Sequence, residues 1–399
     1  MTALLCTMPH ARGDEAPATF YWEGRRLAEV KRALEAGSAG EEVERAIELL
    51  KAEAAGALER EPRSVIDKQQ PPPSGDKHDY ISYAVYWWPD PSKPNGKPFI
   101  RRDGYTNHAQ RAKGDRDRLK TMIEDVESLA LANYLFGDKA YGAHARRLLV
   151  TWLIDPATRM NPHLRYAQAV VGVTEGRGSG LIDTRGFVEL LDSIVLLTQT
   201  GALQDADVAA LDRWFAEYYE WLLTSEHGRD ERRADNNHGT WYAAQVARMA
   251  LHLHDEPTAR ELIEEARSTR LAAAIEADGS QPEELERTRS LHYSIFNLAA
   301  FAYLACMGEP QGIDLWNHSA DGRGSMRQAL LFAAPHVLDQ QSWPYEEVRT
   351  YALNPQAVQL MRMAAARYDE PLFRQVLREG PRSEPRRDWS TLVFALPEE

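Results

Sequence analysis

Apolar residues recur at spacings of three and four in several segments, as expected for helices that bury one face. The clearest case has Phe187, Leu190, Leu191, Ile194 and Val195 in register. Asp183 or Thr184 precedes this segment and is expected to cap the helix. The segments 208–222 and 291–302 repeat the spacing, whereas strand-like alternation is scarce. The pattern therefore predicts an all-α protein.

Short acidic turns separate several of the predicted helices, at 136–138, 254–257 and 368–371. Proline follows the acidic residues in the last two turns, where it suits the first turn of the next helix. The recurrence favours antiparallel helical hairpins that bury a core by packing side by side. The alternative is a coincidence of common turn residues.

Two long segments interrupt the helical pattern. Residues 68–107 are rich in Pro, Gly and aromatic side chains, and residues 160–180 are rich in Gly and small side chains. Long loops within a compact domain are usually functional. Because no linker divides the chain, we expect a short N-terminal extension, 1–20, and one helical domain, 21–399.

Charge and cysteine content limit the classes of partner. The 399 residues include 47 Lys and Arg against 60 Asp and Glu, a formal charge of -13. This balance argues against nucleic acid and anionic membranes as partners, and a polyanion would need clustered arginines. Cys6 and Cys306 supply neither a disulfide framework nor a CxxC metal site.

The amino terminus is a poor secretory signal, and no segment approaches the expected length of a membrane span. These features predict a cytoplasmic protein as written, or a periplasmic or secreted one if a signal was removed. The oligomeric state stays open.

Polar residues gather before an alanine-rich segment, in the run Asp235-Asn236-Asn237-His238. A helix entrance offers free backbone N–H groups and a positive dipole end to an anion. The alternative is that Asp235 or Asn236 only caps the helix and that His238 is an ordinary surface histidine.

Arg289 and Tyr293 are four residues apart and are expected to be neighbours on one helix face. A guanidinium beside a phenol favours the phenolate and so makes the tyrosine a better base. The alternative is a surface arginine stacked on a tyrosine.

The first long loop combines flat rings with cations, in Trp87 and Trp88 followed by Lys97, Arg101 and Arg102. Rings pack on sugar faces, and cations bind carboxylates. The alternative is that the two tryptophans attach the loop to the helical core.

Several common chemistries lack their motifs. The run 176–180 is glycine-rich but has no nucleotide-binding spacing, and the chain has no HExxH or GxSxG motif. Hydrolysis by paired carboxylates stays open, although no pair stands out. The distinctive set is Asn, His, Arg and Tyr.

A series of motifs stands in a characteristic order along the chain. They are Lys77-His78-Asp79-Tyr80, Tyr86-Trp87-Trp88-Pro89-Asp90-Pro91, Met160-Asn161-Pro162, Tyr166-Ala167-Gln168, Gly176-Arg177-Gly178, Ile182-Asp183-Thr184-Arg185, Asn236-Asn237-His238 and Leu291-His292-Tyr293. In these motifs the chain, from about 21 to about 351, resembles the alginate lyase superfamily of polysaccharide lyases. The resemblance implies an (α/α) toroid or incomplete barrel of helical hairpins, with a substrate cleft across its top.

The chemistry implied by the resemblance is β-elimination of a 1,4-linked uronan, polymannuronate or glucuronan, without a metal or organic cofactor. Asn237 and an arginine would neutralise the carboxylate, His238 would take the C5 proton, and Tyr293 would protonate the C4 oxygen. Tyr293 could also do both proton transfers, because the C5 proton and the C4 oxygen lie on the same side in these sugars. The better-known mannuronate lyases carry an arginine where this chain has Glu286, so Arg287 or Arg289 is expected to replace it.

We also expect substrate contacts from residues of the motifs and loops. They are Tyr86, Trp87, Trp88, Arg101, Arg102, Tyr166, Gln168, Arg177, Arg185, Trp241 and His292. The expected partner is an acidic polysaccharide. The competing hypotheses are a glycoside hydrolase on the same toroid and a non-catalytic polyuronate-binding protein.

Overall fold

The computed structural model describes residues 15–320 and 322–396. The expectations for residues 1–14, including Cys6, lie outside the described residues. The longer helices are α1 (Gly24–Glu35), α2 (Glu41–Glu59), α4 (Arg116–Phe136), α5 (Lys139–Leu149), α6 (Phe187–Gln199), α7 (Asp205–Thr224), α8 (Glu226–Arg232), α9 (Asn237–His252), α10 (Glu256–Glu265), α13 (Ser290–Gly308), α14 (Met326–Ala333), α16 (Pro355–Arg367) and α17 (Pro371–Glu379).

Shorter elements complete the chain. The one-turn helices are α3 (His108–Arg111), α11 (Leu271–Ala274), α12 (Pro282–Leu285), α15 (Pro335–Leu338) and α18 (Ser390–Val393). The 3-10 and π segments are η1 (Val65–Asp67), η2 (Val150–Ile154), η3 (Gly178–Thr184), η4 (Ala266–Arg270), η5 (Glu309–Gln311), η6 (Gln340–Ser342) and η7 (Pro385–Arg387). The strands are β1 (Ile81–Tyr83), β2 (Trp87–Trp88), β3 (Ile100–Arg101) and β4 (Tyr166–Ala169).

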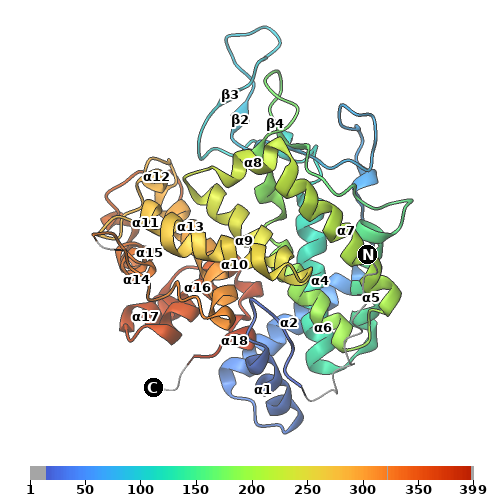
Figure 1. Cartoon of the computed structure of the whole chain (residues 1–399), viewed down its shortest axis with the longest axis vertical. Helices are drawn as coiled ribbons and strands as arrows, with labels where there is room; N and C mark the ends of the chain where they lie inside the picture. Colours follow the sequence, from blue (N-terminus) through green and yellow to red (C-terminus); the bar gives the residue numbers. More distant parts are fainter. Residues whose placement is uncertain (1–14, 321, 397–399) are drawn as a thin grey trace.

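The inner helices form a ring in the order α2, α4, α6, α9, α13, α16 and α18, and α18 packs back onto α2. Outer helices cover this ring: α5 packs on α4, α10 on α9, α14 on α13 and α17 on α16 (Figure 1). This arrangement confirms the predicted all-α toroid of helical hairpins.

Most of the inner helices are buried on nearly all sides, as expected for helices that are surrounded by others, whereas α2 keeps a charged face exposed. In α13 only His292 and Phe296 are partly exposed. The segment Ser290–Gln311 is long and apolar enough to cross a membrane, yet 89% of its apolar 18-residue stretch is buried inside the protein. The expectation that no segment reaches that length is therefore wrong, and burial identifies α13 as a core helix.

The acidic turns start outer helices, as predicted. Asp138 accepts a hydrogen bond from the N–H of Ala140 at the start of α5, and Asp255 caps α10 in the same way. Pro257 and Pro371 lie in the first turns of α10 and α17. Carboxylate caps of this kind satisfy N–H groups that have no partner within the helix.

The predicted cap of α6 is wrong. The helix begins after Gly186, and neither Asp183 nor Thr184 caps it. The Asp183 carboxylate instead accepts a hydrogen bond from Tyr80 and pairs with Arg116, which lies 3.2 Å away. Asp183 thus ties the first long loop and α4 to the start of α6.

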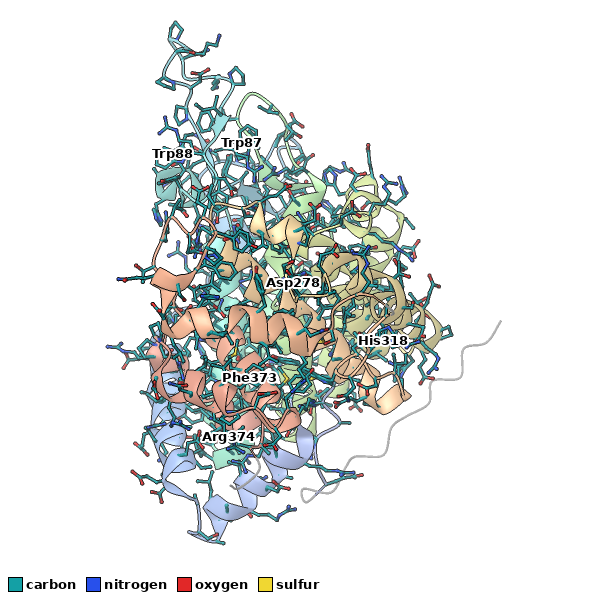
Figure 2. All side chains as sticks on the ribbon, turned by 90° about the vertical axis from the view of Figure 1, so that its left-hand side faces the viewer. Trp87, Trp88, Asp278, His318, Phe373 and Arg374 are labelled. Atoms are coloured by element: carbon teal, nitrogen blue, oxygen red, sulfur yellow. The ribbon has the colours of Figure 1, made fainter. Side chains whose placement is uncertain are left out.

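The two long loops contain short strands that the sequence pattern did not show. Strand β1 pairs with β4 in parallel, with Ile81 opposite Tyr166, so the loops are joined to each other. Strands β2 and β3 form an antiparallel hairpin that extends from one end of the molecule, close to β4 and α8 (Figure 1). Figure 2 shows Trp87 and Trp88 at this end, far from Phe373 and Arg374.

A buried carboxylate attaches the chain before α1 to the ring. Asp192 in α6 accepts hydrogen bonds from the backbone N–H groups of Phe20, Tyr21 and Trp22, and it pairs with Arg248 of α9 at 2.9 Å. Asp192 and Arg248 are both fully buried. One carboxylate therefore joins three segments of the core.

Asp192→Asn is expected to lower the free energy of unfolding by about 3 to 5 kcal/mol, because Arg248 would remain buried without a counter-charge. Urea denaturation followed by circular dichroism measures the change. Asp212→Asn is the matched control, since Asp212 pairs with His252 but is 45% exposed; its loss should stay below about 1 kcal/mol. Equal losses for the two variants would contradict the prediction.

Candidate active site

Tyr293 lies in the first turn of α13 and is 9% exposed. Its hydroxyl donates a hydrogen bond to the hydroxyl of Tyr86, with an O–O distance of 3.0 Å. Tyr86 directly precedes β2, so it belongs to the 68–107 loop. The loop thus places a second phenol against the predicted catalytic tyrosine.

Arg287 covers the face of the Tyr293 ring. Its guanidinium carbon lies 3.7 Å from the ring centre, and its Nε and Nη2 donate to Asp103 at 3.1 and 2.9 Å. The predicted guanidinium beside the Tyr293 phenol is that of Arg287 rather than Arg289. Arg289 is the non-helical residue just before α13, and its carbonyl accepts a hydrogen bond from the backbone N–H of Tyr293 at 3.0 Å. The four-residue spacing thus joins the two backbones, while the Nε of Arg289 lies 3.6 Å from Glu347.

The environment of Tyr293 favours its protonated form. Burial raises the pKa of Tyr293 above its ordinary value, Tyr86 raises it further, and the Arg287 guanidinium opposes both. The expected shift toward the phenolate is therefore outweighed by desolvation. A phenol that keeps its proton at neutral pH is suited to donate a proton.

His238 lies at the start of α9, after the cap residue Asn236, whose side chain accepts a hydrogen bond from the His238 N–H. The Nδ1 of His238 lies 2.6 Å from Oε1 of Glu231 in α8, and that carboxylate is buried. A carboxylate at this distance fixes the tautomer with the proton on Nδ1 and leaves the lone pair on Nε2. The pair is therefore arranged as an oriented base.

Asn237 is completely buried, and Glu284 of α12 holds its amide. The backbone N–H and the Nδ2 of Asn237 donate to the two Glu284 oxygens at 2.6 and 2.7 Å. Because an ionised carboxylate only accepts hydrogen bonds, it fixes which way the amide points. The Oδ1 of Asn237 has no hydrogen-bond partner among the described residues.

Glu347 connects Arg289 with the first turn of α13. Its Oε1 lies 3.6 Å from the Nε of Arg289, and its Oε2 accepts a hydrogen bond from the N–H of His292. Burial, with help from Arg289 and Arg185, lowers the pKa of His292 to about 3. The imidazole of His292, stacked 5.8 Å from the Phe296 ring, is therefore a neutral flat surface.

Arg177 and Arg185 have no carboxylate within ion-pair distance in the described part of the chain. Arg177 donates to Gln168 at 2.8 Å, and the guanidinium of Arg185 lies 5.5 Å from the Phe296 ring centre. Within residues 15–320 and 322–396, the buried Nε of each arginine has no hydrogen-bond partner. Burial lowers the pKa of both, but guanidinium groups stay charged at neutral pH. These two cations are available for an anion.

The predicted rings and cations of the first loop lie on the hairpin of β2 and β3. Trp87 and Trp88 are half-buried, and the Trp88 indole N–H donates to the backbone of Tyr105. Arg102 lies over the Trp88 ring, and Arg101 donates to Asp103 at 2.7 Å. Their roles in substrate contact stay predictions.

Three predicted substrate contacts are buried. Tyr166 and Gln168 are each 7% exposed in β4, beside the first loop, and their roles stay predictions. Trp241 is fully buried, with Phe296 and Tyr303 rings 5.0 and 5.2 Å from its own. The prediction that Trp241 contacts substrate is wrong, because inner helix α9 directs this side chain into the core.

Sequence reasoning missed the acids that hold the site together. Asp103, Glu231, Glu284 and Glu347 contact Arg287, His238, Asn237 and Arg289, respectively. Asp103 and Arg287 are 184 positions apart, so no local pattern marks the pair. The acids are dispersed: among the described residues no three His, Cys, Asp or Glu side chains could hold a metal ion.

Comparisons with known proteins agree with this architecture. The model of the alginate lyase family matches residues 64–343. An alginate lyase structure from Bacteroides ovatus is 34% identical and has a TM-score of 0.88, with 96% of this chain and 100% of that chain covered. No curated protein matches the chain significantly.

More distant structures share the fold. Alginate lyase A1-III from Sphingomonas species A1 is 16% identical with a TM-score of 0.60, covering 98% of this chain and 100% of that chain. A variant of A1-III complexed with a tetrasaccharide is 15% identical with a TM-score of 0.59, covering 97% of this chain and 99% of that chain. From the family match and the Bacteroides relative it follows that the chain belongs to the alginate lyase family and is a polysaccharide lyase.

Proposed function

We propose that the substrate is a β-1,4-linked uronan, polymannuronate or glucuronan, and that the products carry a C4=C5 double bond. The arrangement of His238 on Glu231 and Tyr293 under Arg287 is the observation that carries this proposal. It combines an oriented base with a protonated phenol. β-Elimination needs one group of each kind.

In the proposed reaction the Nε2 of His238 takes the C5 proton of the sugar whose own C4–O4 bond breaks; the neighbouring sugar leaves with O4. The electron pair of the C5–H bond forms the C4=C5 double bond as the C4–O4 bond breaks. Tyr293 gives its proton to the departing O4, and its phenolate charge then lies beside the Arg287 guanidinium. General acid–base steps of this kind contribute about 10²- to 10⁴-fold each.

The C5 proton becomes acidic enough only when the charge of the adjoining carboxylate is cancelled. We assign this task to an arginine without an internal carboxylate partner, with Arg185 as first choice. Asn237, predicted for the same task, is completely buried and its Nδ2 already donates to Glu284. Arg287 is less suited, since Asp103 already occupies its Nε and Nη2. Arg289 is better suited than Arg287 but less suited than Arg185, because its Nε has a carboxylate neighbour, Glu347, at the longer distance of 3.6 Å.

A polyuronate also explains why unpaired cations are retained in a chain with a formal charge of -13. Local charge governs the capture of a polyanion, and a buried unpaired guanidinium is costly unless a ligand neutralises it. The relatives named as alginate lyases, one complexed with a tetrasaccharide, support the same class of substrate.

The test is ultraviolet absorbance of the conjugated product, with polymannuronate, polyguluronate and glucuronan incubated in parallel. Absorbance that rises with polymannuronate or glucuronan supports the proposal and names the sugar. Release of reducing ends without absorbance would indicate hydrolysis instead. A folded protein that produces neither signal on all three polymers would overturn the proposed substrates.

Arg185→Met tests the assigned arginine. Methionine keeps an unbranched stem beside Phe296 but removes the charge, so kcat/KM should fall about 10- to 100-fold, as for a lost charged hydrogen bond. The melting temperature should not fall, because no internal ion pair is lost.

Arg25→Met removes the same charge from an exposed position of α1, at the opposite end of the molecule from the hairpin, and should keep wild-type kinetics (Figure 1). An Arg185→Met variant with unchanged kcat/KM would remove Arg185 from the mechanism.

A further inference from the structure

Asp103 joins the first long loop to residues 287–293, which carry Arg287 and Tyr293 and are called the catalytic segment below. The carboxylate follows β3 and accepts hydrogen bonds from Nε and Nη2 of Arg287 at 3.1 and 2.9 Å. It also accepts from the backbone N–H and the hydroxyl of Thr288, at 3.2 and 3.1 Å, and from Arg101 at 2.7 Å. Asp103 is therefore bound to two consecutive residues that lie just before α13.

The backbone beside Asp103 lies as close to the same segment as a glycine allows. Gly104 has a φ of +75°, and a Cβ there would lie 2.6 Å from the Thr288 hydroxyl and 2.8 Å from a methyl group of Val348. Any other residue would combine an unfavourable backbone conformation with steric overlap. The loop is therefore fitted against the catalytic segment over Asp103 and Gly104 together.

The contact fixes the position of the Arg287 guanidinium. A carboxylate that binds Nε and Nη2 together holds the planar group in one orientation. In that orientation the guanidinium carbon is 3.7 Å from the Tyr293 ring centre. The same loop carries Tyr86, whose hydroxyl accepts the hydrogen bond of Tyr293.

We propose that Asp103 is a positioning residue that holds Arg287 on the ring of Tyr293 and fastens the 68–107 loop, so that Tyr86 reaches the Tyr293 hydroxyl. This inference rests on the proposed role of Tyr293 as proton donor. When Tyr293 gives up its proton, negative charge develops on the phenol, and a fixed cation beside the ring stabilises that charge without reorganisation.

A double-mutant cycle with the full-length protein tests the inference. Asp103→Asn should lower kcat about 10- to 100-fold and change KM less than about threefold, since the contact acts on the transition state. If Asp103 acts through Arg287, the variant with both Asp103→Asn and Arg287→Met should be no slower than Arg287→Met alone. Losses that multiply, or an Asp103→Asn variant with wild-type kcat, would overturn the proposal.

Asp90→Asn is the matched control. Asp90 lies in the turn between β2 and β3, where its hydrogen bonds to the described residues go to Ser92 and the backbone nearby, so the same loss of charge should leave the kinetics unchanged. A second measurement does not depend on turnover: limited proteolysis within 68–107 should be faster in Asp103→Asn than in Asp90→Asn. If the wild type is inactive on every polymer, the proposed substrate fails, whereas unchanged proteolysis in Asp103→Asn overturns the fastening of the loop.

Discussion

Tyr293→Phe is expected to lower kcat by about 10³-fold or more, with KM changed by less than about threefold. The variant loses the only proton that Tyr293 can give to the departing C4 oxygen, and general acid catalysis contributes about 10²- to 10⁴-fold. The ring itself stays, so its packing against Arg287 and the shape of the site should be preserved. Initial rates of product absorbance over a range of polymer concentrations measure both constants.

Tyr219→Phe is the matched control for this variant. It removes a buried tyrosine hydroxyl on α7 that donates to Asp255 at 2.7 Å, so it loses a comparable hydrogen bond outside the site. We expect kcat to stay within about twofold of the wild type. A Tyr293→Phe variant that retains most of its turnover would exclude Tyr293 as the proton donor.

The pH dependence follows from the same environment. Because burial raises the pKa of Tyr293 above the ordinary value near 10, the phenol stays protonated as pH rises from 7 to 10. Activity that needs this proton is therefore present below the raised pKa and is lost only above it. A loss of kcat below pH 10 must come from another group.

Much of the fold could be predicted from the sequence because its signals are local. The apolar spacing of α6, α7 and α13 and the acidic starts of α5 and α10 each depend on neighbouring residues. The order of helices around the ring depends on contacts between distant segments, as does the pairing of β1 with β4. The cap of α6 was mispredicted because the carboxylate of Asp183 serves the neighbouring loop and Arg116 instead.

The residues of the site also divide into those with a local sequence signal and those that only distant contacts bring in. Tyr293, His238 and Asn237 stand in recognisable motifs, and the structure shows carboxylates or cations around each of them. The partners come from elsewhere in the chain: Asp103 lies on a loop, Glu231 on α8 and Glu284 on α12. The spacing of Arg289 and Tyr293 predicted the wrong guanidinium, because the side chain of Arg289 lies near the distant Glu347 and Arg287 covers the ring.

His238→Gln tests which group takes the C5 proton. If His238 is the base, kcat should fall about 10²- to 10⁴-fold, because the amide nitrogen that replaces Nε2 cannot accept a proton. If Tyr293 performs both transfers, the loss should stay near tenfold, since His238 would then only line the site. The raised pKa of Tyr293 favours the first outcome, because a phenol that holds its proton cannot begin the reaction as a base.

His252→Gln is the matched control for His238→Gln. His252 lies at the other end of α9, and its Nε2 is 3.0 Å from Asp212, so both histidines on this helix contact a carboxylate. Its replacement should leave kcat within about twofold of the wild type. If His238→Gln lost no more activity than His252→Gln while Tyr293→Phe remained inactive, both proton transfers would have to be assigned to Tyr293. In that case the Glu231 carboxylate would serve to anchor the start of α9.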